Sequence, residues 1–524
     1  MNDLLFNELI SLTSFDFLKM DNDTALITIG LLVDLSCDYR QQVGFQKAYE
    51  LINELRLRDI TSSQRAILEY TEANYWDGVR YFNLEENLWN WTQLELEKEL
   101  ICLRRAVLIA EEEGCLPTNR MCQIYTNLAN VFSQVGRYVE ASYYWRKALS
   151  RNENFQMAIG NYGYGLFSYA RVLYDDGHQS LFLHQAYRKL KASLEYDLDG
   201  NATQAFLRCS NEIERIMEKD FLEKEIDLTS YSMGVDEVEK NYRSWCLKNS
   251  LFLNPLNDLG EYSIANNDIL TCPSIRIRDN AESEGPIYHG FYNALKQEYV
   301  YARWLVYEGL KISKGSTHLS DKDVYLYNTL DYPVYGFSIQ QMASAYRIAY
   351  SLFDKIAYFI NDYLELQIPQ DKVNFRTLWF KKREQKLGLR EEFICRKNWS
   401  LRGLYWLSLD LYYKDFEFRE AVDPNSRNMS ALRNHLEHKY VKVHEYFVSR
   451  SDDNYHDPFE DTLAYSVSRD QFEAMTMNIL RLARAALIYL SLGINEEEIQ
   501  KKRESSGLIM PLVLDEYDDE WKKR

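Results

Sequence analysis

The chain has 524 residues, enough for about two to four domains of ordinary size. Only 21 Gly and 9 Pro are present, well below the average usage of about 7% and 5%. This composition excludes loop-rich sandwiches and barrels and favours long helices. The formal net charge of −18 excludes a protein that is basic overall, so a nucleic-acid partner has to meet a local basic patch.

The start of the chain and the cysteines bear on its location. Residues 1–8 contain two acids and no basic group, unlike a secretory signal. The longest apolar stretches, 25–33 and 485–492, are shorter than a membrane span. The eight Cys residues form no CxxC pair, so neither a disulfide framework nor a zinc site is predicted. We therefore expect a cytoplasmic protein with reduced thiols, no membrane contact, and no metal or other cofactor.

Residues 121–154 carry the clearest internal pattern. Bulky and small side chains recur there at the positions where tetratricopeptide repeats keep them, namely Tyr125, Leu128, Ala129, Phe132, Gly136, Tyr138, Ala141, Trp145 and Ala148. Further helix pairs are predicted at 25–55, 66–110 and 155–195. One pair cannot bury its own apolar face, so residues 1–219 are predicted to stack as a helical solenoid. Such a surface usually binds a partner; the alternative is that the repeats only support the rest of the chain.

The remainder of the chain divides into a connector and a second helical region. Turn residues collect between 220 and 335, which predicts a connector that packs on the next domain. Helical periodicity then returns at 342–363, 398–413, 427–446 and 471–492. These helices predict a bundle over 336–524. The expected fold class is therefore all-α, a tetratricopeptide-like solenoid followed by a bundle.

Residues 426–447 are predicted to form one amphipathic helix that collects the chemistry. The chain contains no P-loop, no GxSxG and no HExxH. On this helix Arg433 and Glu437, and likewise Asn434 and His438, are spaced to lie one above the other. An imidazole exchanges protons near neutral pH, and a guanidinium matches phosphate oxygens. This set suits cleavage of a phosphodiester without a metal.

The run from Arg433 to His438 is an R-x4-H motif, and it resembles the motif of HEPN-superfamily ribonucleases. Two looser spacing matches, Arg171 to His178 and Arg450 to His456, fall at the end of a repeat helix and in a predicted loop. Further blocks resemble the HEPN clade that follows tetratricopeptide-type repeats. These blocks are residues 241–246, 253–259, 336–361 and 374–379.

The resemblance implies roles for individual residues. Arg433 would stabilise the phosphate charge, His438 would act as general acid or base, and Asn434 would orient the reacting groups. His435 is open between a structural and a functional role. Two acids are candidates for support, namely Asp354 and Glu437; for Asp354 a plain solvated acid is equally open.

The resemblance also implies an activity and a setting. Family members form an all-α bundle that dimerises, so that two motif helices face each other in one cleft. They cut RNA without a metal, leave a 2′,3′-cyclic phosphate and a 5′-hydroxyl, and often act as toxins or in abortive defence against phage. For this chain that implies a homodimer, an RNA substrate, and a protein or phage-derived trigger at the repeats.

Charge is distributed in a way that agrees with an RNA substrate. Residues 376–450 contain 16 basic and 10 acidic residues, a local excess of six positive charges in a chain of −18. RNA is expected to enter there and to be repelled elsewhere; the alternative is a solvated helix end. The predicted RNA-binding residues are Lys381, Lys382, Arg383, Lys439 and Lys442.

The sequence therefore predicts a cytoplasmic homodimeric endoribonuclease with a repeat sensor. One alternative is a repeat adaptor whose HEPN domain binds RNA or a nucleotide without cutting it. Another is the toxin half of a toxin–antitoxin pair. The presence of both Arg433 and His438 favours the enzyme, since a retired site is free to lose either residue.

Overall fold

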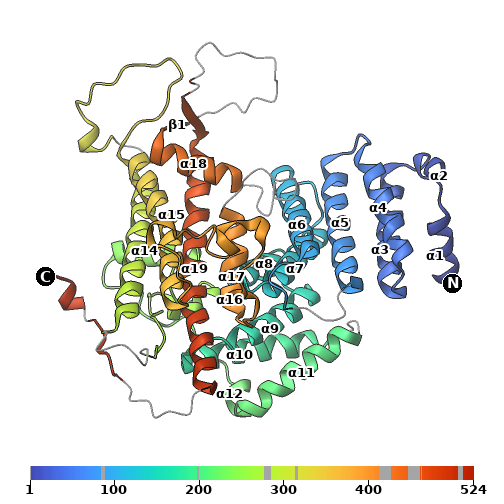
Figure 1. Cartoon of the computed structure of the whole chain (residues 1–524), viewed down its shortest axis with the longest axis horizontal. Coiled ribbons are helices and arrows are strands. Elements are labelled where there is room, and N and C mark those ends of the chain that lie inside the picture. The colour runs from blue at the N-terminus through green and yellow to red at the C-terminus, as the bar shows by residue number, and fades with distance from the viewer. Residues whose placement is uncertain are drawn as a thin grey trace.

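The architecture is that of a computed structural model of the whole chain. It describes residues 2–83, 89–196, 200–276, 285–312, 317–411, 426–445, 461, 463–504, 512–517 and 519–523. Within these ranges the fold is all-α with a single two-stranded sheet, as the scarcity of Gly and Pro predicts (Figure 1).

The N-terminal part is a row of helical hairpins that runs from the free N-terminal end toward the C-terminal bundle (Figure 1, blue to green). The pairs predicted at 25–55, 66–110, 121–154 and 155–195 are all present, and neighbouring hairpins pack side by side. The helices are α1 (Asn2–Ser11), α2 (Ser14–Leu18), α3 (Asn22–Tyr39), α4 (Gln42–Arg56), α5 (Ser62–Asn83), α6 (Leu94–Glu113), α7 (Thr118–Gln134), α8 (Tyr138–Arg151), α9 (Gln156–Ala170), α10 (Asp176–Ser193), α11 (Gly200–Ile216) and α12 (Lys219–Glu223).

Trp145 shows how one hairpin locks onto the next. Its indole on α8 fills the space beside Gly165 on α9, where an added Cβ would lie 2.2 Å from the ring. The indole Nε1 donates to Asn130 Oδ1 at 3.1 Å, and the ring lies 5.8 Å from that of Tyr162. Trp145 therefore fills the space between neighbouring hairpins, and this packing depends on a residue without a side chain opposite it.

The connector contains more helix than the sequence indicates. Its elements are α13 (Glu237–Lys248), the 3₁₀ turns η1 (Pro255–Asp258), η2 (Ser263–Ala265) and η3 (Leu319–Asp321), and the long helix α14 (Ile287–Ile312). Asp258 in η1 accepts from Tyr169 of the repeats at 3.0 Å and from Arg484 of the C-terminal helix at 2.6 Å. Helix α14 packs along α15 (Phe337–Tyr363), the first helix of the bundle. It is therefore part of the bundle, although the sequence predicts its residues to belong to the connector.

The C-terminal bundle surrounds one buried helix. It comprises α15 (Phe337–Tyr363), α16 (Glu391–Ile394), α17 (Trp399–Leu411), α18 (Ser426–His438), the strands β1 (Tyr440–His444) and β2 (Ala464–Ser468), and α19 (Arg469–Glu504). One window of α19 has a mean hydropathy of 1.4, enough by length and composition to cross a membrane, but 83% of it is buried inside the protein. Its apolar character therefore serves the core, where it contacts α14, α15 and α17.

The predicted helix over 426–447 is wrong in its second half. Helix α18 ends at His438, and Tyr440–His444 forms strand β1, which pairs in parallel with β2. Residues 440–444 alternate Val with longer side chains, a pattern that favours a strand once a partner strand is available. The partner strand β2 lies more than twenty residues further along the chain. Helical periodicity within the segment therefore predicted the wrong secondary structure for it.

A buried ion-pair cluster joins the repeats to the bundle. Asp410 of α17 is fully buried and accepts from both terminal nitrogens of Arg104, at 2.7 Å each, and from Arg137. Arg137 also pairs with Glu140, which accepts from Tyr489 of α19. Burial raises the pKa of the Asp410 carboxyl, but Arg104 and Arg137 outweigh it and hold the pKa below its ordinary value. The two halves of the chain therefore share one interior.

Replacing Gly136 by alanine is expected to destabilise this junction. Gly136 has φ +88°, and a Cβ there would lie 2.1 Å from the carbonyl oxygen of Trp399 on α17. Overpacking costs about 1–3 kcal/mol, and a left-handed non-glycine residue adds about 1–2 kcal/mol. Urea unfolding measures the loss. The control is Gly30→Ala in α3, where nothing lies within 4 Å and the stability is expected to hold or rise; equal effects at both positions would contradict this account.

Candidate functional site

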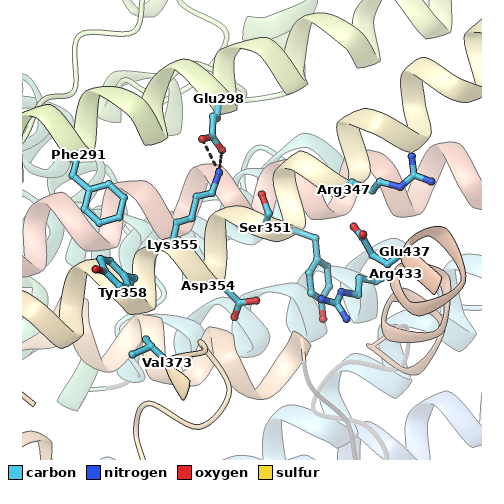
Figure 2. Close-up of a pocket in the computed structure, with 11 residues that line it drawn as sticks. Phe291, Glu298, Arg347, Ser351, Asp354, Lys355, Tyr358, Val373, Arg433 and Glu437 are labelled. Atoms are coloured by element: carbon cyan, nitrogen blue, oxygen red, sulfur yellow. Dashed lines mark hydrogen bonds and ion pairs between the residues drawn. The ribbon is translucent and has the colours of Figure 1, made fainter. Parts of the chain in front are cut away.

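A cavity of about 510 Å³ opens between α14, α15 and α18. Figure 2 shows its lining, with α15 contributing most of the side chains. The lining residues are Phe291, Glu298, Arg347, Tyr350, Ser351, Asp354, Lys355, Tyr358, Val373, Arg433 and Glu437. Three residues predicted from the sequence, Arg433, Asp354 and Glu437, are thus brought together.

Arg433 reaches the cavity from α18. Its guanidinium lies 5.6 Å from the centre of the Tyr350 ring, and its Nη1 donates to Asn434 Oδ1 at 3.3 Å. The Tyr350 hydroxyl in turn donates to the carbonyl of Leu411 at 3.3 Å. The arginine is therefore held over an aromatic floor, and neither of these contacts neutralises its charge.

The acids of the cavity come from three helices. Asp354 Oδ1 accepts from the backbone N–H of Phe375 at 2.9 Å, which fixes the orientation of the carboxylate. Glu437 lies one turn beyond Arg433 on α18, as the spacing predicts. Glu298 of α14 pairs with Lys355, with 2.6 Å between Nζ and Oε1. Asp354 therefore lines the same cavity as Arg433, and its supporting role stays a prediction.

Arg347 is a second arginine of the cavity, and it was not among the residues predicted from the sequence. Its Nε and Nη2 donate to the carbonyl of Leu436 at 3.1 and 2.7 Å, so it holds the C-terminal end of α18. Arg347, Ser351, Asp354 and Lys355 follow a helical i, i+4, i+7, i+8 spacing. This polar stripe along α15 is the pattern in the sequence that could have indicated the wall of the cavity.

The other motif residues do not line the cavity. His438 is the last residue of α18 and is exposed. It lies five residues after Arg433, about 140° around the helix axis. Asn434 is exposed next to Arg433. His435 is half-buried, its Nδ1 lies 2.8 Å from the Ala431 carbonyl, and its ring lies 5.3 Å from that of Tyr465. These contacts favour the structural role for His435.

The predicted RNA-binding residues divide into exposed and buried groups. Lys442 is buried in β1 and pairs with Asp331 at 2.6 Å and Asp461 at 3.0 Å, so its charge is already compensated. Lys439 is exposed directly after α18. The other three form the exposed 3₁₀ turn η5 (Lys381–Arg383), in which Lys381 pairs with Glu391 at 2.5 Å.

Of the two alternative spacing matches, the one from Arg171 to His178 is described, and its two residues do not share one exposed face. Arg171 ends α9 and is exposed, whereas His178 is buried on α10, where burial lowers its pKa. Arg450 and His456 lie outside the described residues. Among the described residues, one group of three has metal-ligand spacing: Glu69, Glu72 and Cys102. That group lies in the repeats, away from the cavity.

Comparisons with known proteins identify the domain that contains the cavity. The family model described as LA2681-like HEPN matches residues 280–497, a range that begins upstream of α14 and includes α18. No curated protein matches the chain. A solved structure, the crystal structure of BtubC (BKLC) from P. vanneervenii, aligns at 16% identity over 45% of this chain and 96% of that chain. Its TM-score of 0.27 is too low to bear on fold or function. Residues 280–497 are therefore a HEPN-family domain of the LA2681-like type, and such a domain suggests RNase or nucleotide-binding activity.

Proposed function

We propose that this protein is a metal-independent endoribonuclease of the HEPN type. The observation that carries the proposal is the position of Arg433, which enters a cavity beside Asp354 from the same helix that ends in His438. That helix lies within the range matched by the HEPN family model.

The proposed reaction is transesterification within RNA. A ribose 2′-hydroxyl attacks the adjacent phosphorus, and the bond to the 5′-oxygen of the next nucleotide breaks. His438 takes the proton from the 2′-hydroxyl or gives one to the leaving oxygen, while Arg433 stabilises the charge that grows on the phosphate. Asn434 orients these groups. The products are a 2′,3′-cyclic phosphate and a 5′-hydroxyl.

Two copies of α18 complete the proposed site. Arg433 and His438 diverge by about 140° around one helix, and His438 does not line the cavity of its own chain. In a homodimer with the two α18 helices facing each other, Arg433 of one copy and His438 of the other reach the same phosphate. RNA approaches over Lys439 and the exposed turn Lys381–Arg383.

The repeats are proposed to sense the trigger. On the family resemblance we place the protein in anti-phage or abortive-infection defence, where a protein or phage-derived signal binds the tetratricopeptide-like row. The buried contact of Arg104 and Arg137 with Asp410 supports this role, because it joins the row to α17, the helix that precedes α18.

A second candidate function is binding of a nucleotide or RNA without cleavage. The cavity volume of about 510 Å³ falls within the range of small-molecule sites. Its wall includes the aromatic rings of Phe291, Tyr350 and Tyr358, on which a base can stack.

His438→Ala is expected to lower RNA cleavage by about 10²–10⁴-fold, the usual contribution of a general acid or base. Purified wild type and variant are incubated with end-labelled cellular RNA in EDTA, and the fragments are tested for cyclic phosphate ends. Growth on expression, with and without phage infection, is the parallel readout.

The control for this experiment is His456→Ala, which is expected to keep full activity. Loss of activity there would mean that the Arg450 to His456 spacing marks the site. Wild type that cuts no RNA under any condition, or His438→Ala that cuts equally well, would refute the nuclease proposal. Calorimetric binding of a nucleotide in that case would favour the second candidate.

A further inference from the structure

Residues 324–335 form an arm whose large apolar side chains are exposed in the described part of the structure. Tyr325 and Tyr327 are each 95% exposed, and Tyr332 is 73% exposed. The remaining exposed apolar residues of this tyrosine arm are Val324, Leu326, Leu330 and Tyr335. In Figure 1 the loop that contains it stands off the end of the bundle beside β1. Seven exposed apolar side chains within twelve residues mark a site of interaction.

The arm is anchored at its base. The backbone N–H of Val334 donates to the carbonyl of Val443 in β1 at 2.6 Å. The Asp331 carboxylate accepts from Lys442 at 2.6 Å, and the Asp331 carbonyl lies 3.0 Å from His444 Nδ1. The arm is therefore fixed to the strand that directly follows α18, and only its outer part projects.

The composition of the outer part favours a protein partner over RNA. Residues 324–330, Val-Tyr-Leu-Tyr-Asn-Thr-Leu, contain no charge, whereas RNA binding depends on cations that neutralise phosphate. Apolar stretches with high β-propensity and no charge associate with other polypeptide when they are left exposed. Two bulky residues, Leu330 at φ 66° and Tyr332 at φ 50°, also stand in the left-handed region, which costs about 1–2 kcal/mol each.

We propose that the tyrosine arm clasps a second copy of this chain. This rests on the composite site of the proposed function, in which two α18 helices face each other. The arm lies at the same end of the molecule as α18 and β1. Two further exposed apolar residues lie at this end, Tyr440 at 42% and Leu463 at 73% exposure, and they are the docking surface for the arm of the other copy. Each copy gives an arm and receives one, as a two-fold interface requires.

The experiment measures the mass of the full-length protein in solution. Wild type is expected to be a dimer by light scattering and sedimentation, and the double variant Tyr325→Asp, Tyr327→Asp is expected to dimerise more weakly by about tenfold or more. Both side chains are almost fully exposed, so the variant keeps its fold, and an unchanged thermal melt checks this. The matched control is Tyr231→Asp, an exposed tyrosine of the connector, which is expected to dimerise like wild type.

Wild type that stays monomeric at every concentration overturns the proposal, and so does a double variant that dimerises as tightly as wild type. If the double variant is dimeric while wild type cuts RNA, the arm assignment fails and the nuclease stands. If the double variant becomes monomeric while wild type cuts no RNA, the assignment of the arm stands and the nuclease proposal fails.

Mixing two inactive variants tests whether the second copy completes the site. Arg433→Ala and His438→Ala are each expected to be inactive alone, but their heterodimer holds one intact pair. Cleavage is therefore expected to return on mixing, and it is expected not to return when both partners also carry the Tyr325→Asp, Tyr327→Asp change. Recovery that is equally strong without the arm tyrosines would contradict the clasp.

Discussion

Arg433→Ala is expected to lower the rate of RNA cleavage by about 10²–10³-fold, the usual loss when a group that stabilises transition-state charge is removed. The guanidinium lies over Tyr350 and lines the same cavity as Asp354. Its helix, α18, also carries His438. Its partners in the described structure are an aromatic ring and a neutral amide, so the positive charge is available to phosphate. Single-turnover cleavage of labelled RNA measures the effect.

The matched control is Arg208→Ala, which removes the same charge from an exposed position on α11. It is expected to cut at the wild-type rate. Arg433→Lys is expected to recover only part of the activity, because an ammonium lacks the planar fork that pairs with two phosphate oxygens. If Arg433→Ala cuts RNA as fast as wild type, Arg433 does not take part in the reaction.

Asp410→Ala is expected to lower the free energy of unfolding by about 3–5 kcal/mol, the cost of breaking a buried ion pair from one side. The change leaves Arg104 and Arg137 buried without the carboxylate that joins them. Because this cluster lies between the repeats and α17, the loss is expected to separate one cooperative unfolding transition into two. Urea unfolding followed by circular dichroism measures both effects.

The pH dependence gives an independent check on Asp410. Its pKa is held below the ordinary value, so its stabilisation is present above about pH 4, the unfolded aspartate pKa, and is lost as the pH falls through the folded value. The difference between wild type and Asp410→Ala is therefore expected to be constant from neutral pH to pH 5. The control Asp371→Ala, at an exposed position, is expected to leave stability unchanged. A difference that vanishes near pH 6 would contradict the paired state.

Local patterns in the sequence were enough for the helical hairpins and for the shared face of Arg433 and Glu437. The spacing of small and bulky residues around Trp145 predicted the hairpin pairs. Helix periodicity and the order of small and large side chains are local properties that can be recognised within about thirty residues. The i, i+4 spacing likewise predicted that Arg433 and Glu437 share a face. Asp354 was suggested only through the resemblance to HEPN domains, and the structure places it in the same cavity.

Tertiary structure alone decided where α18 ends and what its side chains face. Strand β1 exists because a partner strand and the Lys442 ion pairs with Asp331 and Asp461 are supplied by distant segments. The pair of Arg104 with Asp410 spans 306 positions, and no local pattern signals it. The sequence by itself determined an all-α chain with an R-x4-H helix. The tertiary structure decided the cavity around Arg433, the exposure of His438 and the tyrosine arm, because burial and charge pairing depend on residues that meet only after folding.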